Sequence, residues 1–269
     1  MLYLVASPIG NLSDITLRAL DALKASDYIL CEDTRRSSIL LNHHGILKPK
    51  VSYHKFKEKE REEEIARDLG QGKVISFLSD AGSPGIDDPG QKLVELAKRE
   101  KIPYSILPGP CALIAALSAT GWEINSFQWM GFLPKTESQL QEKLIGALEF
   151  PGISVFYEAP HRILDTLLLL SKLSPERTFG VSREITKMFE EHLEGSAFEL
   201  MAHFKINPPK GEFVLMIKPS DADRQAQPLA ERIKKLQKTY DLSLKEAIVI
   251  GSKIFPESKR EIYQQIHRA

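Results

Sequence analysis

The clearest indication of the fold class in this chain of 269 residues is the stretch KVISFLSDAGSPGIDDPG at residues 73–90. Its first six residues are suited to a buried strand, and the next twelve hold three glycines, two prolines and three aspartates. A plain connector needs fewer special residues, and such a loop is costly to order unless it holds a ligand. Open parallel sheets bind ligands beyond the carboxyl ends of their strands, so this stretch predicts a sheet with a site at its edge.

Outward from this stretch, apolar runs alternate with helical stretches through the first 120 residues. We expect strands at residues 2–6, 27–31, 51–53, 73–78 and 104–107. We expect helices at residues 14–25, 35–44, 58–70 and 89–100. This alternation predicts an α/β fold with a mainly parallel sheet that is covered on both faces.

Strands become more frequent relative to helices in the second half, which predicts a second, mixed sheet. We expect its strands at residues 126–132, 153–158, 177–182, 188–194 and 211–218. We expect its helices at residues 111–119, 137–149, 161–172 and 196–204. The predicted organisation is an N-terminal α/β domain, a second α/β domain, a polar linker and a helical C-terminal segment, at residues 1–109, 110–218, 219–229 and 230–269.

The C-terminal segment, residues 230–269, is predicted to hold helices at 230–239, 243–253 and 257–267. Ser-x-x-Glu capping boxes begin the second and third of these helices, at Ser243 and Ser258. Nine lysines and arginines against five aspartates and glutamates give the segment a net charge of +4. The excess indicates either a nucleic-acid contact or a solvated helical face.

The composition, with 42% hydrophobic and 27% charged residues, is that of an ordinary soluble protein. Its 36 lysines and arginines balance 36 aspartates and glutamates, so net charge does not indicate a nucleic-acid binder. Cys31 and Cys111 lack partners at metal-ligand spacing, which predicts two reduced thiols and no metal site. The first apolar run is short enough for a strand, and none reaches the ~18 residues of a membrane span. We therefore expect a cytoplasmic protein.

Other loops at predicted strand ends also carry residues suited to a site. They are SPIGN (7–11), CEDTR (31–35), LPGPCALIAAL (107–117), FYEAPHR (156–162) and SREITKMFEE (182–191). Glycine and small residues in the first and third allow backbone to approach a ligand closely. Neither GxGxxG nor GxxxxGK[ST] occurs, which argues against dinucleotide and P-loop sites. The residues alone predict an enzyme with a small cofactor and leave its reaction open.

The charged loops allow two interpretations. Glu32 and Asp33 are both able to reach a site from a loop, but with Arg35 they would equally form a surface ion-pair cluster. Lys187 is suited to phosphate and equally to solvent. FYEAPHR combines an aromatic ring, an acid, an imidazole and a guanidinium, which suits a base and a phosphate, although His161 alone is more often a residue that begins a helix.

Several motifs together resemble the tetrapyrrole-methylase superfamily of S-adenosylmethionine enzymes. In chain order they are SPIGNLSDITLRAL, CEDTR, SDAGSPGIDDPG, PGPCALIAALSATG, GFLPK, FYEAPHR, SREITKMFEE and GEFVLMI. More narrowly, they resemble the bacterial ribosomal RNA small-subunit methyltransferase I family, from residue 2 to about residue 218, and the tail LSLKEA…SKREIY is similar to that family's C-terminal segment. SDAGSPGIDDPG and FYEAPHR are specific to this branch, because the tetrapyrrole and diphthine branches carry a shorter GGDP- or GDP-like loop.

The resemblance implies two α/β domains with a cleft between them for S-adenosylmethionine, assembled as a homodimer. It implies 2′-O-methylation of a cytidine ribose in the decoding region of small-subunit (16S) rRNA. Carried over residue by residue, cofactor contacts fall on Pro8, Asp80, Ala81, Gly82, Cys111, Ala112, Tyr157, Glu158 and Ile185. Many family members have serine where this chain has Cys111, so a backbone contact there would survive and a hydroxyl contact would weaken.

Transfer of a methyl group already activated on a sulfonium needs mainly alignment, and a ribose hydroxyl needs a positioned base. Candidate bases are Glu32, which we favour, Asp33 and Glu184. We expect further contacts from Arg162 in the active site, where it would hold phosphate, and from Arg35, Arg36 and Lys187 to RNA. The basic tail would add affinity that falls with salt.

Two other functions stay open. One is a methylase of a porphyrinoid small molecule, which would methylate uroporphyrinogen rather than RNA. The other is a non-catalytic RNA-binding or ribosome-binding protein, which would fail to bind the cofactor. The intact SDAG loop argues against the second.

Overall fold

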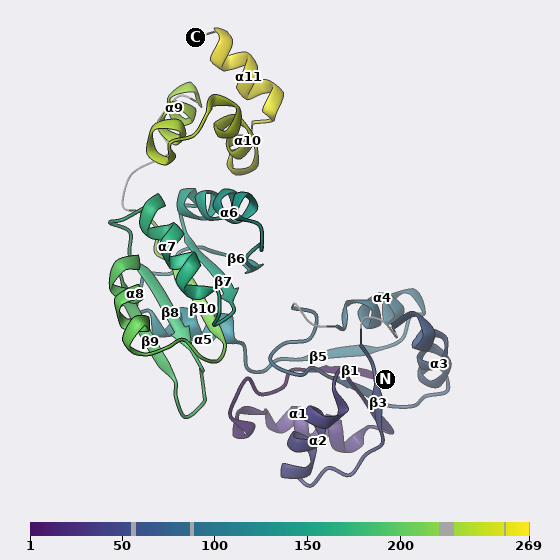
Figure 1. Ribbon diagram of the computed structural model, residues 1–269. Helices are drawn as coiled ribbons and strands as arrows, with labels where there is room; N and C mark the ends of the chain where they lie inside the picture. Colours follow the sequence, from purple (N-terminus) through teal and green to yellow (C-terminus); the bar gives the residue numbers. More distant parts are fainter. Residues whose placement is uncertain (55–57, 87–88, 221–228, 256, 269) are drawn as a thin grey trace. The chain divides into compact units, whose positions relative to one another are not determined.

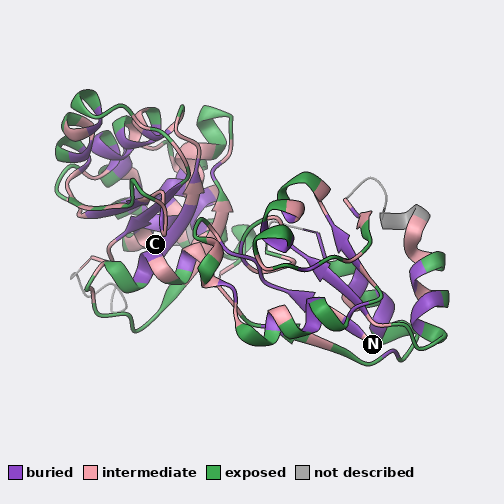
Figure 2. Ribbon diagram, turned by 90° about the horizontal axis from the view of Figure 1, so that it is seen from below, coloured by how far each residue is buried: buried purple, intermediate pink, exposed green. Residues whose placement is uncertain are grey.

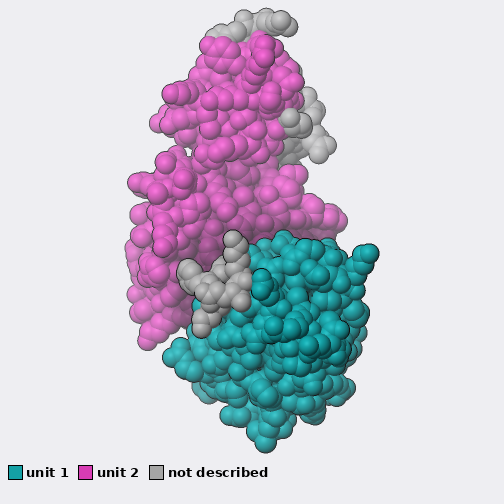
Figure 3. Space-filling model, turned by 90° about the vertical axis from the view of Figure 1, so that its right-hand side faces the viewer, with its two compact units in different colours: residues 1–115, 185–188 teal, residues 116–184, 189–269 magenta. Residues whose placement is uncertain are grey.

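Residues 1–54, 58–86, 89–220, 229–255 and 257–268 are described by the computed structural model of the protein (Figure 1). The chain divides into two units, which Figure 3 colours separately. The first unit comprises residues 1–115 and 185–188, and the second comprises residues 116–184 and 189–269. The first boundary thus lies six residues beyond the expected one at 109/110, and Ile185–Met188 returns to the first unit from within the second.

The first unit is built on a parallel sheet, as the alternation of strands and helices predicts. The strands are β1 (Leu2–Val5), β2 (Tyr28–Cys31), β3 (Lys50–Ser52), β4 (Ile75–Leu78) and β5 (Tyr104–Leu107). Their order is β3-β2-β4-β1-β5, and every described pair is parallel. All four residues of β4 are buried, in keeping with a strand covered on both faces.

Helices cover both faces of this sheet. They are α1 (Leu17–Ala25), α2 (Thr34–His43), α3 (Glu58–Gly70) and α4 (Gln91–Arg99). One core joins sheet residues to α3 and α4, and the other joins the opposite sheet face to α1 and α2. Figure 2 shows the buried residues concentrated along the strands. The helix expected from residue 14 begins at Leu17, because residues 12–14 form a 3-10 turn and Thr16 caps α1.

The second unit is built on a mixed sheet, which confirms the prediction for this half. Its strands are β6 (Phe127–Phe132), β7 (Ile153–Glu158), β8 (Phe179–Arg183), β9 (Glu191–Gly195) and β10 (Phe213–Ile217). The order is β6-β7-β10-β8-β9, with β6 and β7 parallel and the other pairs antiparallel. The strand expected from residue 188 begins at Glu191, because Ile185–Met188 leaves the sheet for the first unit.

Further helices accompany this sheet and the C-terminal segment. They are α5 (Ala112–Ala119), α6 (Glu137–Glu149), α7 (Ile163–Leu173), α8 (Ala197–Ile206), α9 (Leu229–Tyr240), α10 (Leu244–Ile254) and α11 (Lys259–Arg268). Both predicted capping boxes are present, at Ser243 and at Ser258. Most of the expected linker, residues 221–228, lies outside the described residues.

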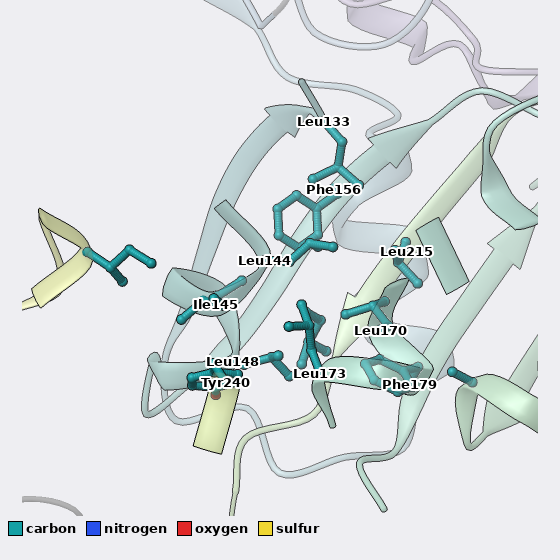
Figure 4. Close-up of a cluster of buried hydrophobic side chains, with 14 of the residues drawn as sticks. Leu133, Leu144, Ile145, Leu148, Phe156, Leu170, Leu173, Phe179, Leu215 and Tyr240 are labelled. Carbon is teal, nitrogen blue, oxygen red and sulfur yellow. The ribbon is translucent and has the colours of Figure 1, made fainter. Parts of the chain in front are cut away.

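The C-terminal helices pack on the second unit through α6. Leu148 and Tyr240 belong to one apolar core, which Figure 4 shows. The Tyr240 hydroxyl donates to Glu149 at 2.8 Å, and Lys253 pairs with Glu142. Part of the basic C-terminal segment therefore packs on α6 and stabilises the second unit.

Asp68 joins two partners at the rim of the first unit. It accepts from Lys73 Nζ at 2.9 Å and from the Tyr28 hydroxyl at 3.1 Å. The Lys73 ammonium, acting against desolvation, holds the pKa of Asp68 below its usual value. A lowered folded-state pKa adds stability that is present above the unfolded pKa of about 4 and is lost as the pH falls through the lower folded pKa.

Asp68→Asn is expected to remove this acid-sensitive part of the stability. The free energy of unfolding, measured with urea at several pH values, should then fall less steeply below pH 4 than in the wild type. Asp21→Asn is the matched control, because Asp21 is exposed on α1. Equal pH profiles for the wild type and Asp68→Asn would contradict the assignment.

Candidate functional site

Three loops meet at the carboxyl edge of the first sheet, because β4, β1 and β5 are neighbours. Ser7 after β1 and Gly82 after β4 exchange two backbone hydrogen bonds, both of 3.0 Å. The buried Ser79 hydroxyl donates to the Gly82 carbonyl at 2.6 Å and accepts from the Ser7 N–H at 3.3 Å. The SDAG sequence is therefore a fixed turn rather than a loose connector. Ser79 fixes this turn from a buried position, a role that the sequence did not suggest.

Two glycines allow close packing of these loops. Gly82 has a φ of +68°, a conformation that side chains other than glycine rarely adopt. A Cβ on Gly109 would lie 2.8 Å from the Cβ of Ala6, so the loop after β5 rests directly against the end of β1. The three strand ends together present a cradle of main-chain groups.

Seven of the residues predicted to contact a cofactor belong to the first unit. They are Pro8, Asp80, Ala81, Gly82, Cys111, Ala112 and Ile185. Pro8, Gly82 and Ile185 are buried, while Ala81 is exposed and the others are half-buried. Strand-end loops far apart in the sequence thus bring most of the predicted set to one edge.

Asp80 also ties the loop after β2 to this edge. Its Oδ1 accepts from the Asp33 N–H at 3.1 Å, and its Oδ2 lies 3.9 Å from Arg36 Nη1. Asp33 caps α2 and binds Arg35 through both carboxylate oxygens, at 3.1 and 2.8 Å. Hydrogen bonds from Arg35 lower the pKa of Asp33 to about 2, which makes it a weak base. Glu32, half-buried beside it, is the stronger candidate of the two.

The segment Ile185–Met188 packs on the first loop of the first unit. The Thr186 hydroxyl accepts from the Asn11 N–H at 3.0 Å. A Cβ on Gly10 would lie 2.5 Å from Lys187 Cγ and 2.7 Å from Thr186 Oγ1, so only glycine allows this approach. Thr186 has a φ of +67°, and such a conformation persists where surrounding contacts hold it. The contact brings Ile185 and Lys187 to the strand-end loops.

Glu184, another candidate base, is held within the second unit. Its Oε1 accepts from the Glu212 N–H at 3.1 Å, and its own N–H donates to the Glu212 carbonyl at 3.1 Å. The adjacent Gly211 has a φ of +83°, and a Cβ there would lie 2.1 Å from the same Oε1. One carboxylate oxygen is thus fixed by backbone.

The FYEAPHR residues form a clamp inside the second unit. The buried Glu158 carboxylate accepts from Thr166 Oγ1 at 2.9 Å and from the Ala159 N–H at 2.8 Å. Arg162 lies 3.5 Å from Glu158 Oε1 and donates to the carbonyls of Leu133 and Pro134. The sequence suggested Glu158 and Arg162 for ligand contact. In the structure, these two side chains instead connect the end of β7 to the residues that follow β6.

Tyr157 lies in an aromatic cluster next to this clamp. Its ring meets Trp129 and Phe132 edge to face, with centroid distances of 6.0 and 5.7 Å. Phe132 is 57% exposed and His161 is exposed. The cluster offers aromatic surface at the ends of β6 and β7.

Among the described residues, no cluster of three or more His, Cys, Asp and Glu side chains is arranged to hold a metal ion. No helix in the same part of the chain is long and apolar enough to cross a membrane.

Known protein structures share this fold. A cobalamin biosynthetic enzyme, cobalt precorrin-4 methyltransferase, superposes with a TM-score of 0.59 at 18% identity, over 80% of this chain and 93% of its own. The methyltransferase CobJ gives a TM-score of 0.61 at 17% identity, over 83% and 95%. At such identities the likeness shows the architecture alone.

Sequence relatives are far more similar. Proteins named ribosomal RNA small subunit methyltransferase I are 36% identical in Streptococcus pyogenes serotype M1, over 99% of this chain and 94% of that relative, and 39% identical in Haemophilus influenzae, over 98% and 95%. The namesake from Hydrogenobaculum sp. is 43% identical over 80% of this chain and 94% of its own length. The profile of tetrapyrrole (corrin/porphyrin) methylases matches residues 1–201. The chain therefore belongs to the tetrapyrrole methylase family and, within it, to the ribosomal RNA small subunit methyltransferase I group of S-adenosylmethionine-dependent methyltransferases.

Proposed function

We propose that this enzyme methylates the 2′-hydroxyl of a cytidine in small-subunit (16S) rRNA. The relatives at 36–43% identity carry small-subunit rRNA in their names, whereas the porphyrinoid methylases share only the fold. The observation that carries the proposal is the junction of three strand-end loops, in which Ser79 and Gly82 join the loops after β1 and β4, and Gly109 packs the loop after β5 on Ala6. A homodimer in the cytoplasm is part of the same proposal.

The strand-end cradle fits the cofactor. Gly82 and Gly109 let the strand-end loops pack closely on one another, and a tight turn of this kind suits the close approach of the amino-acid and nucleoside parts of S-adenosylmethionine. Cys111 lies just before α5, where backbone N–H groups are free of helix partners. The residues that would hold the cofactor are Pro8, Asp80, Ala81, Gly82, Cys111, Ala112 and Ile185 of the first unit. When bound, the cofactor supplies a methyl group already activated on a sulfonium.

The protein's own part in the reaction is to orient the ribose hydroxyl and to accept its proton. We assign this role to Glu32, because it lies in the loop after β2 that Asp80 ties to the strand-end loops, and because Arg35 makes the neighbouring Asp33 a weak base. We assign contacts with RNA phosphates to Arg36, which is exposed beside Asp80, and to Lys187 of the segment Ile185–Met188. We assign a third contact with RNA to Arg35, which lies at the same helix start and is paired with Asp33.

Glu32→Gln is expected to lower kcat by about 100-fold or more, because the amide cannot accept the proton. The Kd for S-adenosylmethionine, measured by calorimetry, should stay within a factor of two. Glu184→Gln is the matched control, since its amide oxygen can still accept from Glu212. A kcat that falls for Glu184→Gln and not for Glu32→Gln would transfer the role to Glu184.

Cofactor binding is expected to protect Cys111 from alkylation. Cys31 is an internal control, because burial raises the pKa of its thiol to about 11 and removes it from solvent. Iodoacetamide at pH 8, followed by mass spectrometry, should label Cys111 several-fold more slowly with saturating cofactor and leave Cys31 unlabelled in both cases. Equal rates for Cys111 with and without cofactor would place the ligand elsewhere.

The function is tested with labelled S-adenosylmethionine, the purified protein and small ribosomal subunits from a strain lacking this gene. Label mapped to the ribose of one cytidine by ribose-specific digestion is the expected result. No label on subunits or free rRNA, with the cofactor still bound, would exclude the rRNA substrate. Uroporphyrinogen in a parallel assay would then test the porphyrinoid alternative.

A further inference from the structure

The helices α9, α10 and α11 form a small three-helix bundle in which each helix contacts the other two. They lie beyond residue 201, where the match to the methylase family ends. A Cβ on the buried Gly251 of α10 would lie 2.5 Å from Ile233 Cδ1 of α9 and 3.5 Å from Ile262 Cδ1 of α11. The helices therefore cross closely at one point, which fixes the orientation of α11.

The buried Ile262 turns one face of α11 inward, and the opposite face is open to solvent. Lys259, Arg260, Tyr263 and Gln264 line an open hollow of about 550 Å³ on this helix. Their spacing places them side by side on the helix surface. We call these four residues the α11 face. Tyr263 is 56% exposed, so a large aromatic ring stands among cations.

The cations of the α11 face are not neutralised. Lys253 of the same bundle pairs with Glu142, but Lys259 and Arg260 have no ion-pair partner within the described residues. The nearest carboxylate on the helix, Glu261, accepts from the N–H and hydroxyl of Ser258 at 2.7 and 2.6 Å. The Glu261 carboxylate therefore caps the helix and, in the described part of the chain, makes no ion pair with Lys259 or Arg260.

We propose that the α11 face binds a single-stranded segment of RNA, with Lys259 and Arg260 on phosphates and Tyr263 stacked on a base. The polyanion complements the free cations, and an exposed ring can stack only on a base that is not already stacked in a duplex. Gln264 can donate to and accept from a base edge. The inference rests on the proposed function, which makes RNA the substrate.

The test measures the Kd of the full-length protein for a single-stranded oligonucleotide copied from small-subunit rRNA, over a range of salt concentrations. Lys259→Gln/Arg260→Gln should weaken binding and reduce the slope of log Kd against log salt by about 1.4, at ~0.7 per phosphate contact. Tyr263→Ala should weaken binding by about tenfold, and Tyr263→Phe should restore it. The same RNA as a duplex should bind more weakly and should not respond to Tyr263→Ala.

The matched control is Lys234→Gln/Lys235→Gln, an equal change of charge on exposed residues of α9. An equal loss of salt slope in this control would show a diffuse charge effect and overturn the assignment to the α11 face. Unchanged affinity for RNA with weakened binding to whole subunits would point to a ribosomal protein instead, and would also overturn it.

Methylation of subunits separates this proposal from the proposed function. If the wild type methylates rRNA and the α11 variants keep its KM and its Kd for RNA, this proposal alone fails. If the wild type methylates no rRNA, the proposed function fails whatever the oligonucleotide measurements show.

Discussion

Arg162→Met is expected to lower the free energy of unfolding of the second unit by about 3 kcal/mol, as for other buried ion pairs that lose one partner. The Glu158 side chain has no exposed surface, so its charge would stay buried without the guanidinium 3.5 Å away. The carbonyls of Leu133 and Pro134 would lose their donors as well. The melting temperature should fall by roughly 6–12 °C.

Urea unfolding of the wild type, Arg162→Met, Glu158→Gln and the double variant would measure the coupling between the two side chains. Arg162→Lys is the conservative control and should recover part of the loss through its charge alone. An Arg162→Met protein as stable as the wild type but inactive would return Arg162 to the substrate-binding role that its motif suggested. Stability and activity lost together, with full cofactor binding at low temperature, would support the structural role.

Gly10→Ala is expected to raise the Kd for S-adenosylmethionine by about tenfold or more. The new methyl group would overlap Lys187 Cγ and Thr186 Oγ1 and lie 3.0 Å from the Ile185 carbonyl, so the segment after Glu184 must move away. Overpacking of this kind costs about 1–3 kcal/mol, and 1.4 kcal/mol corresponds to tenfold in affinity. The loss should appear in cofactor affinity because Ile185 moves with the segment.

Gly70→Ala provides the control for this substitution. A Cβ on Gly70 meets nothing within 4 Å, and the residue ends a helix of the same unit. Calorimetry should give it the wild-type Kd and an unchanged or slightly raised stability. A Gly10→Ala protein with the wild-type Kd would mean that the segment Ile185–Met188 takes no part in binding the cofactor.

The strands and helices could be predicted because their signals are local. Apolar runs such as residues 75–78, separated by Gly and Pro loops, define both sheets, and the Ser-x-x-Glu spacing defines two helix starts. The position of SDAG at a strand end also followed from the sequence, since it comes directly after β4.

Other features depend on contacts that no local pattern contains. Thr186 meets Asn11 across 175 positions, and its left-handed backbone has no signature in an ordinary β-branched residue. Arg162 and Glu158 look like ligand-binding residues in a motif, and their burial against the chain after β6 appears only in three dimensions. The type and order of the helices and strands could therefore be predicted from local sequence, whereas contacts between residues far apart in the chain could not.

Because Ile185–Met188 belongs to the first unit, this unit can be completed only late in the synthesis of the chain. When Ala115 has been translated, all five strands of the first sheet exist, but the hydroxyl that accepts from Asn11 is still 71 residues away. At roughly 5–20 residues per second, the nascent first unit waits about 4–14 s for Thr186 to be made. A fragment released by a stop codon or a protease before that point would carry the strand-end loops without the segment Ile185–Met188 that packs on them. Binding of the cofactor should therefore begin only after most of the chain has been synthesised.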